Sequence, residues 1–167
     1  EDAHIPTWGT QLTTPVVKDE FAKVNLKTKL DVPAGKAFEG YRIVTELKDK
    51  DGKVVAANEK KGGPFDDNVF EQDFVVTSPA LWTPDTPHLY SAVSKVYEGN
   101  TLKDEYTTSF GIRSIEIIPN KGFFLNGKKT MFKGVCNHHD LGPLGGIAND
   151  AGIRRQIRIL KDMGCNA

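Results

Sequence analysis

The sequence predicts an all-β fold, an antiparallel immunoglobulin-like β-sandwich, followed by a short βα tail. Between residues 15 and 117, apolar and polar residues alternate in short runs, turn residues separate the runs, and no helical period occurs. About six or seven such runs within about a hundred residues are typical of an immunoglobulin-type sandwich. Because the Cys–Trp–Cys core of antibody domains is absent, this likeness concerns the architecture alone.

The first runs have clear strand and turn signals. In residues 21–30, apolar residues alternate with mostly lysine positions, so one face is expected to be buried and the other wet. A proline and a glycine within 31–35 end this run, and residues 41–47 alternate again. Asp51–Gly52 predicts a hairpin turn before the next strand at 54–57.

The second half of the sandwich contains one irregular segment between strands. Residues 79–90 include three prolines, which exclude a central strand there. We expect this segment to be an ordered crossing whose Leu81 and Trp82 pack on the sandwich. The strand candidates of this half are 68–76, 88–99 and 105–117, with a turn at Gly99–Asn100.

After residue 118 the pattern changes to that of a βα unit. Asn126–Gly127 predicts the turn of a hairpin within 123–135, and a glycine-rich loop follows. Asp150 is expected to cap a helix that Gly164 ends. One βα unit cannot cover its own strand, so the tail is expected to begin a larger α/β domain. The apolar stripe of the helix, which should face that domain, is Ile153, Ile157, Leu160 and Met163.

The composition excludes several classes of partner. The 22 basic and 22 acidic residues balance and are scattered, so neither nucleic acid nor a membrane surface is expected. No apolar run of about 18 residues and no signal peptide is recognisable. Cys136 and Cys165 form neither a disulfide framework nor a CxxC zinc pair, so free thiols are expected. The predicted organisation is a linker from a missing upstream domain (1–14), the sandwich (15–118) and a truncated α/β domain (119–167).

The loop GVCNHHDLGPLGG (134–146) contains the candidate site residues His138, His139 and Asp140. Adjacent side chains on an extended chain point to opposite sides, which disfavours one shared metal ion. The chain has no GxSxG elbow, and the loop lacks a P-loop ending. A structural loop with one hydrogen-bonded histidine and a metal site both stay open at this point. If 130–135 is the first strand of a barrel, His138 lies at the catalytic face of that barrel.

The tail carries motifs that are specific when taken together: Asn126–Gly127–Lys128, Lys133–Gly134–Val135, His138–His139–Asp140, Gly146 and the run 161–167. With these motifs, residues 123–167 resemble the start of the catalytic (β/α)8 barrel in glycoside hydrolase family 2. This family contains β-galactosidases, β-glucuronidases and β-mannosidases. The stretches LWTPDTPHLY (81–90) and SFGIRSIEI (109–117) are similar to its immunoglobulin-like domain and exit strand. The loop is similar to that of the bacterial β-galactosidases.

The resemblance implies a parent protein that is a retaining hydrolase of terminal β-galactosides in carbohydrate metabolism. Retention requires two carboxyl groups about 5 Å apart, and the family's two glutamates lie on later barrel strands, beyond Ala167. Its magnesium ligands also lie beyond Ala167, so this fragment is expected to hold no catalytic residue, metal or cofactor and to be inactive alone. His138 matches the histidine that lines the sugar pocket, and His139 and Asp140 are further substrate-binding candidates. The glutamates expected on wet strand faces are Glu98, Glu105 and Glu116.

The resemblance also implies partners for the parent protein. They are a β-galactoside-type carbohydrate, the rest of the barrel, the family's jelly-roll sugar-binding domain and further copies in a homo-oligomer. A periplasmic or exported bacterial protein is compatible with the family, and the sandwich would be a structural module between domains. Two other functions stay open. One is a free-standing module that binds carbohydrate or protein near Trp8 or Trp82, and the other is a metal-dependent enzyme that uses the loop residues His138, His139 and Asp140.

Overall fold

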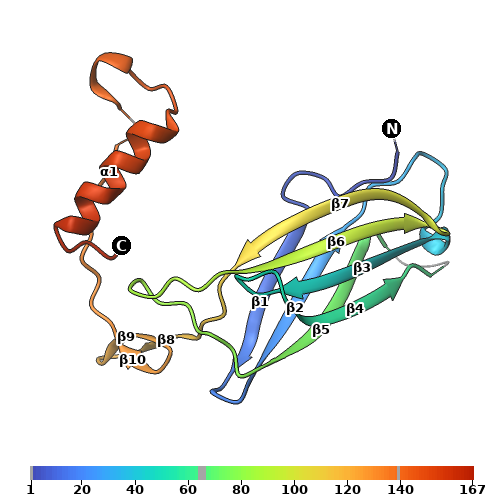
Figure 1. Cartoon of the computed structure of the whole chain (residues 1–167), viewed down its shortest axis with the longest axis horizontal. Helices are drawn as coiled ribbons and strands as arrows, with labels where there is room; N and C mark the ends of the chain where they lie inside the picture. The colour runs from blue at the N-terminus through green and yellow to red at the C-terminus, as the bar shows by residue number, and fades with distance from the viewer. Residues whose placement is uncertain (1, 64–66, 139) are drawn as a thin grey trace. The chain divides into compact units, whose positions relative to one another are not determined.

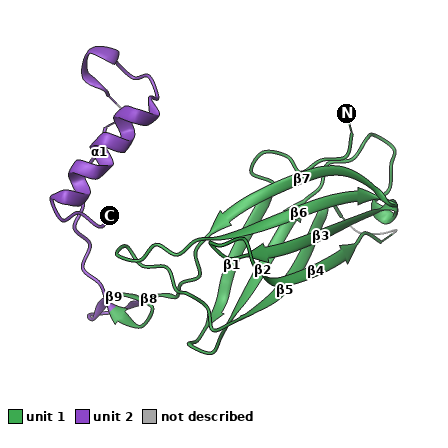
Figure 2. Cartoon of the chain, in the orientation of Figure 1, with its two compact units in different colours: residues 1–116, 124–128 green, residues 117–123, 129–167 purple. Residues whose placement is uncertain are grey.

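The structure is a computed structural model of the chain that describes residues 2–63, 67–138 and 140–167 (Figure 1). Its contacts divide the chain into two compact units, each described here by itself (Figure 2). The chain leaves the first unit after Glu116, returns to it at Phe124 and leaves it again after Lys128. The domain boundaries expected from the sequence remain predictions. The first unit is Glu1–Glu116 with Phe124–Lys128, and the second is Ile117–Phe123 with Lys129–Ala167.

The first unit is an antiparallel β-sandwich, which confirms the predicted fold class. One sheet has the strand order β1-β2-β5 and the other β4-β3-β6-β7 (Figure 1). The chain changes sheet after β2, after β4 and after β5, so each sheet combines strands that are separated in the sequence. The elements are β1 (Thr10–Val17), β2 (Phe21–Lys29), the short 3-10 helix η1 (Phe38–Gly40), β3 (Tyr41–Lys48), β4 (Val54–Lys61), β5 (Val69–Thr77), β6 (Tyr90–Glu98) and β7 (Thr101–Phe110).

The burial of side chains along the strands follows the alternation predicted from the sequence. On β2, Val24 and Leu26 are buried while Lys23 and Lys27 are exposed, because successive side chains of a strand point to opposite faces. The same period of two buries every second residue of β3, β5 and β6. The large apolar side chains buried in the core are Leu26, Leu30, Ile43, Leu47, Phe70, Val76 and Val96.

Gln72 crosses this apolar interior from one sheet to the other. Its side chain, on β5, is only 2% exposed. Its partners on β3 are Thr45 and Ile43. The Gln72 side chain accepts a hydrogen bond from Thr45 Oγ1 at 2.8 Å and donates through Nε2 to the Ile43 carbonyl at 3.3 Å. The same Nε2 donates to the carbonyl of Asn58 on β4 at 3.0 Å. Because both ends of the amide are hydrogen-bonded, it joins the two sheets without being left as an unpaired polar group in the interior.

The segment between β5 and β6 is the expected crossing. Trp82 forms an isolated antiparallel β-bridge with Pro87, and Leu81 forms an isolated parallel β-bridge with Ile112. The segment is therefore ordered without being a central strand. Leu81 packs on the core. Gly111 lies so close to Trp82 that a Cβ there would come within 2.8 Å of the Trp82 Cβ. The prediction that Leu81 and Trp82 pack on the sandwich is therefore confirmed.

The short strands after β7 form the predicted hairpin, with the order β10-β9-β8. Asn126 and Gly127, at φ 50° and 73°, form the tight turn between β9 and β10, as Asn-Gly predicts. None of the helices in the described part of the chain is long and apolar enough to cross a membrane. The remaining elements are β8 (Ile115–Ile118), β9 (Gly122–Leu125), β10 (Lys128–Lys129), the 3-10 helix η2 (Gly142–Leu144) and α1 (Asp150–Asp162).

Two local expectations were wrong in detail. The residue that caps α1 is Asn149, whose side chain accepts from Gly152 N at 2.9 Å, because the helix already begins at Asp150. No strand forms over 130–135, since no neighbouring strand is present to complete a ladder. Strand β1, which begins at Thr10, was not singled out from the sequence, because its threonines and Pro15 obscure the alternation.

The buried amide of Gln72 makes the first testable prediction. Gln72→Ala leaves the carbonyls of Ile43 and Asn58 without this donor inside the sandwich, so we expect a loss of about 2–4 kcal/mol in the free energy of unfolding. Urea unfolding followed by circular dichroism measures it. The matched control is Gln11→Ala, on the exposed face of β1. Equal unfolding midpoints for the two variants would contradict the prediction.

Candidate functional site

The loop that carries the predicted site residues lies in the second unit, and its described residues are open to solvent. His138 and Asp140 are both exposed, and His139 lies outside the described residues. The loop is tied to α1 by long hydrogen bonds: Asn137 Nδ2 donates to Gln156 Oε1 and Gln156 Nε2 to the Asp140 carbonyl, each at 3.5 Å. The structure thus brings Asp140 to the helix and does not join it to His138.

An asparagine near the chain end organises the segment from which the loop departs. Lys133 N donates to Asn166 Oδ1 at 2.8 Å, and Asn166 Nδ2 donates to the Met131 carbonyl at 3.0 Å. The backbone N–H of Asn166 donates to the Lys133 carbonyl at 2.8 Å. Gly134 lies against Ala167, with no space for a Cβ, which would be 2.6 Å from the Ala167 carbonyl oxygen. The segments 131–134 and 166–167 therefore lie side by side.

This contact gives the second unit the arrangement expected of a βα unit. The segment 131–134 leads into the loop, the loop into α1, and α1 back to a segment beside the first. Gly164, at φ 89°, ends the helix, and Cys165 N donates to the Leu160 carbonyl at 3.0 Å, the bond of a glycine-terminated helix. His138 thus follows the C-terminal end of the first segment, where (β/α)8 barrels place active-site loops.

The same unit exposes several large apolar side chains. On the predicted helix stripe, Ile157 is 54% and Met163 69% exposed. Met131 and Phe132, in the first segment, are 74% and 60% exposed. Exposed apolar residues on both the helix and the segment beside it are typical of a surface that other elements cover.

Among residues 2–63, 67–138 and 140–167, no group of three His, Cys, Asp or Glu side chains can hold a metal ion. Cys136 is exposed, Cys165 is half-buried and both are free thiols. The described residues therefore offer no metal centre on which a reaction step could be built.

Two of the glutamates expected on wet strand faces, Glu98 and Glu105, lie in surface ion pairs. Glu98 accepts from Lys36 Nζ at 2.9 Å and lies 3.3 Å from Lys103 Nζ. The hydrogen bonds from Lys36 and Lys103 hold the pKa of Glu98 below its ordinary value. A general acid for glycoside cleavage requires the opposite, a raised pKa. Glu105 pairs with Lys95 at 3.6 Å, and Glu116 is exposed, as expected of wet strand faces.

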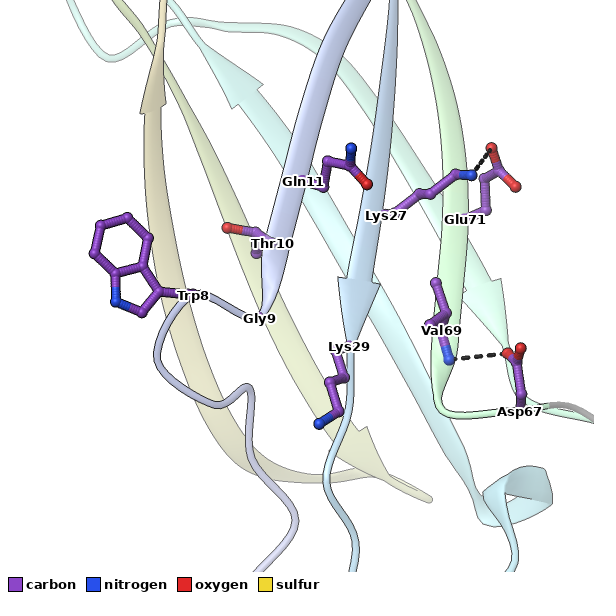
Figure 3. Close-up of a pocket in the computed structure, with 9 residues that line it drawn as sticks. All are labelled: Trp8, Gly9, Thr10, Gln11, Lys27, Lys29, Asp67, Val69 and Glu71. Carbon is purple, nitrogen blue, oxygen red and sulfur yellow. Dashed lines mark hydrogen bonds and ion pairs between the residues drawn. The ribbon is translucent and has the colours of Figure 1, made fainter.

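The outer face of the sheet β1-β2-β5 has an open depression of about 510 Å³ (Figure 3). At its rim Trp8 is 92% exposed and has φ 62°, in a turn closed by a 2.8 Å hydrogen bond from Gly9 N to the Pro6 carbonyl. Figure 3 shows the Trp8 ring beyond the edge of β1, directed away from Lys27 and Glu71. The polar residues that line the depression are Thr10, Gln11, Lys27, Lys29, Asp67 and Glu71.

Two of the residues that organise the tail were not singled out from the sequence. Asn166 was part of a matching run but had no role, because its bonds reach residues far away in the chain. Asn149 was passed over in favour of Asp150, since both residue types cap helices well. Trp82, in contrast, packs on Gly111, and the Arg113 guanidinium lies 4.8 Å from the centroid of the Trp82 ring. Trp82 is therefore a packing residue rather than an open surface for a sugar ring.

Comparison with known proteins shows the family to which the chain belongs. The sequence profile of Glycosyl hydrolases family 2 matches residues 3–113. The chain is 42% identical over 165 residues to Beta-galactosidase BoGH2A from Bacteroides ovatus, covering 98% of this chain and 19% of that protein. It is 35% identical over 156 residues to a putative beta-glucuronidase from Formosa agariphila, covering 93% of this chain and 14% of that protein.

Solved structures give the same result. A glycosyl hydrolase family 2 member from Bacteroides cellulosilyticus superposes with a TM-score of 0.90 at 35% identity, over 98% of this chain and 21% of that chain. A beta-glycosidase from Bacteroides vulgatus superposes with a TM-score of 0.84 at 29% identity, over 98% of this chain and 20% of that chain. The chain thus spans about a fifth of the length of these proteins. The family profile matches the sandwich, and the relatives align over nearly the whole chain. The chain therefore belongs to glycosyl hydrolase family 2.

Proposed function

We propose that this chain is part of a retaining β-glycosidase that hydrolyses terminal β-galactosides. It supplies the immunoglobulin-like module and the first βα unit of the catalytic barrel. The observation that carries the proposal is the Asn166 contact, which sets the segment 131–134 beside 166–167 with a loop and a helix between them. In the whole protein the remaining barrel strands would extend this pair and cover the apolar face of α1.

The role of this chain in the reaction is substrate binding rather than bond cleavage. Retention needs an acid/base and a nucleophile, two carboxyl groups about 5 Å apart. The only carboxylate of the loop 134–146 is Asp140, and the ion-paired Glu98 has a lowered pKa. His138, exposed in the loop, would donate a hydrogen bond to a sugar hydroxyl, and His139 and Asp140 are further candidates. The catalytic pair then comes from later barrel strands.

A neutral galactoside suits the loop better than a glucuronide. Residues 134–146 contain no lysine or arginine, the side chains that would pair with the carboxylate of a glucuronide. The relative with 42% identity is named a beta-galactosidase, whereas the putative beta-glucuronidase is 35% identical. The sandwich is the structural module between domains, and further copies of the whole protein are its expected oligomeric partners.

A second candidate, a carbohydrate-binding module, is favoured by a single observation. Trp8 is 92% exposed at the rim of a polar depression, and exposed aromatic rings are common elements of binding surfaces. Against it, the ring is directed away from Lys27 and Glu71 (Figure 3). We therefore keep it as the alternative.

The loop is tested in the full-length protein. We expect hydrolysis of an aryl β-galactoside but not of an aryl β-glucuronide, and His138→Ala should lower kcat/KM about 100-fold by removing a hydrogen bond that strengthens in the transition state. His88→Ala, on the sandwich, is the matched control and should be neutral. Equal rates for the two variants would overturn the site, and preference for the glucuronide would overturn the substrate.

The βα arrangement is tested in the chain itself by hydrogen exchange. Asn166→Ala removes the side-chain bonds to Lys133 N and the Met131 carbonyl, so the amides of 131–134 should exchange about tenfold faster, as expected for the loss of one or two hydrogen bonds. Asn137→Ala, which removes one bond at 3.5 Å, is the control. Equal exchange in both variants would mean that Asn166 does not hold these segments together.

The alternative function is tested by tryptophan fluorescence. We expect soluble galacto-oligosaccharides at millimolar concentration to leave the emission of the 167-residue chain unchanged. Quenching that saturates, and that Trp8→Ala abolishes while Leu102→Ala on the exposed part of β7 does not, would instead establish a binding module.

A further inference from the structure

We infer that Asn126 is a latch that ends the sandwich unit and fixes the last anchored point of the chain before the second unit. The chain leaves the sandwich after Glu116 and makes a short hairpin. It returns only for Phe124–Lys128, the segment that contains Asn126. If Asn126 holds this returning segment, the joint between the units starts after Lys128 and not at Glu116.

The Asn126 side chain is bonded to the sandwich at both ends of its amide. Ser114 N donates to Asn126 Oδ1 at 2.9 Å, and Asn126 Nδ2 donates to the Trp82 carbonyl at 3.0 Å. Its backbone N–H donates to the Ser114 carbonyl at 3.0 Å. One residue of the turn therefore holds both the strand exit at Ser114 and the crossing segment at Trp82. Leu125, only 8% exposed, packs directly before it.

The carbonyl that receives the latch belongs to a fixed part of the sandwich. Trp82 N donates to the Ile112 carbonyl at 2.8 Å. The Trp82 side chain packs on Gly111, and the Arg113 guanidinium lies 4.8 Å from its ring centroid. A hydrogen bond to such an acceptor restricts the donor more than a bond to a mobile loop would, because the acceptor cannot follow it.

Turn chemistry alone does not account for this asparagine. Asn126 has φ 50°, a conformation that Asn tolerates well, and any Asn-Gly turn would explain it. The preceding turn provides a comparison, because Asn120 has φ 63° there and its side chain is exposed. In the described part of the chain, the Asn120 side chain makes no hydrogen bond of this kind. The two residues share a backbone conformation and differ in their side-chain contacts.

The test compares Asn126→Gly with Asn120→Gly in the 167-residue chain by hydrogen exchange and mass spectrometry. Glycine accepts positive φ without strain, so each variant removes only the side chain. We expect Asn126→Gly to accelerate exchange of the 112–128 amides about tenfold, as the loss of two hydrogen bonds implies. Asn120→Gly should leave those amides unchanged, and β5 should keep its protection in both variants.

A third variant separates the two side-chain bonds. Asn126→Asp keeps the acceptor for Ser114 N but has no donor for the Trp82 carbonyl, so its exchange rates should fall between those of the parent chain and Asn126→Gly. Equal exchange in Asn126→Gly and Asn120→Gly would overturn the latch. Faster exchange throughout β1 to β7 in Asn126→Gly would also overturn it, because Asn126 would then support the whole sandwich rather than the returning segment.

Discussion

The amide of Gln72 joins the two sheets through the middle of an apolar interior, and the order of the sandwich depends on it. Apolar contacts alone tolerate small shifts of one sheet over the other, whereas a buried amide with bonds to the Ile43 and Asn58 carbonyls and the Thr45 hydroxyl fits one arrangement. The crossing segment is held separately, by the hydrogen bond from Trp82 N to the Ile112 carbonyl, and the turn at Asn126 donates to the Trp82 carbonyl.

The second unit has the opposite character. Its helix is capped at Asn149 and ended at Gly164, and Asn166 holds the two segments on either side of the loop. Yet the apolar residues of the helix and of the first segment stay exposed, because one helix cannot cover the two segments beside it and bury its own stripe at the same time. Membership of glycosyl hydrolase family 2 accounts for this: the relatives are about five times longer than the chain, which covers 19% of one of them.

Local rules account for most of what the sequence predicts correctly. Alternation identified the buried faces of β2 and β3, and Asp51–Gly52 and Asn126–Gly127 identified tight turns, because each depends on residues adjacent in the chain. The contacts of Asn166 and Gln72 leave no local pattern, since their partners lie far away in sequence. The barrel interpretation would make 130–135 a strand, but a strand needs a neighbour to pair with, and none forms there. Of the site residues, His138 and Asp140 could be located in an exposed loop, while His139 lies outside the described residues.

We propose that in the whole protein the sandwich is followed by a catalytic barrel whose first loop and helix lie in this chain. Reading the coding sequence of the source genome beyond the codon for Ala167 tests it most directly. The account predicts an open reading frame that continues through further strand–helix repeats, with two glutamates at the carboxyl ends of later strands. A stop codon directly after Ala167, in the natural gene, would contradict it, because the chain would then have no catalytic carboxylates and its loop no active site to complete.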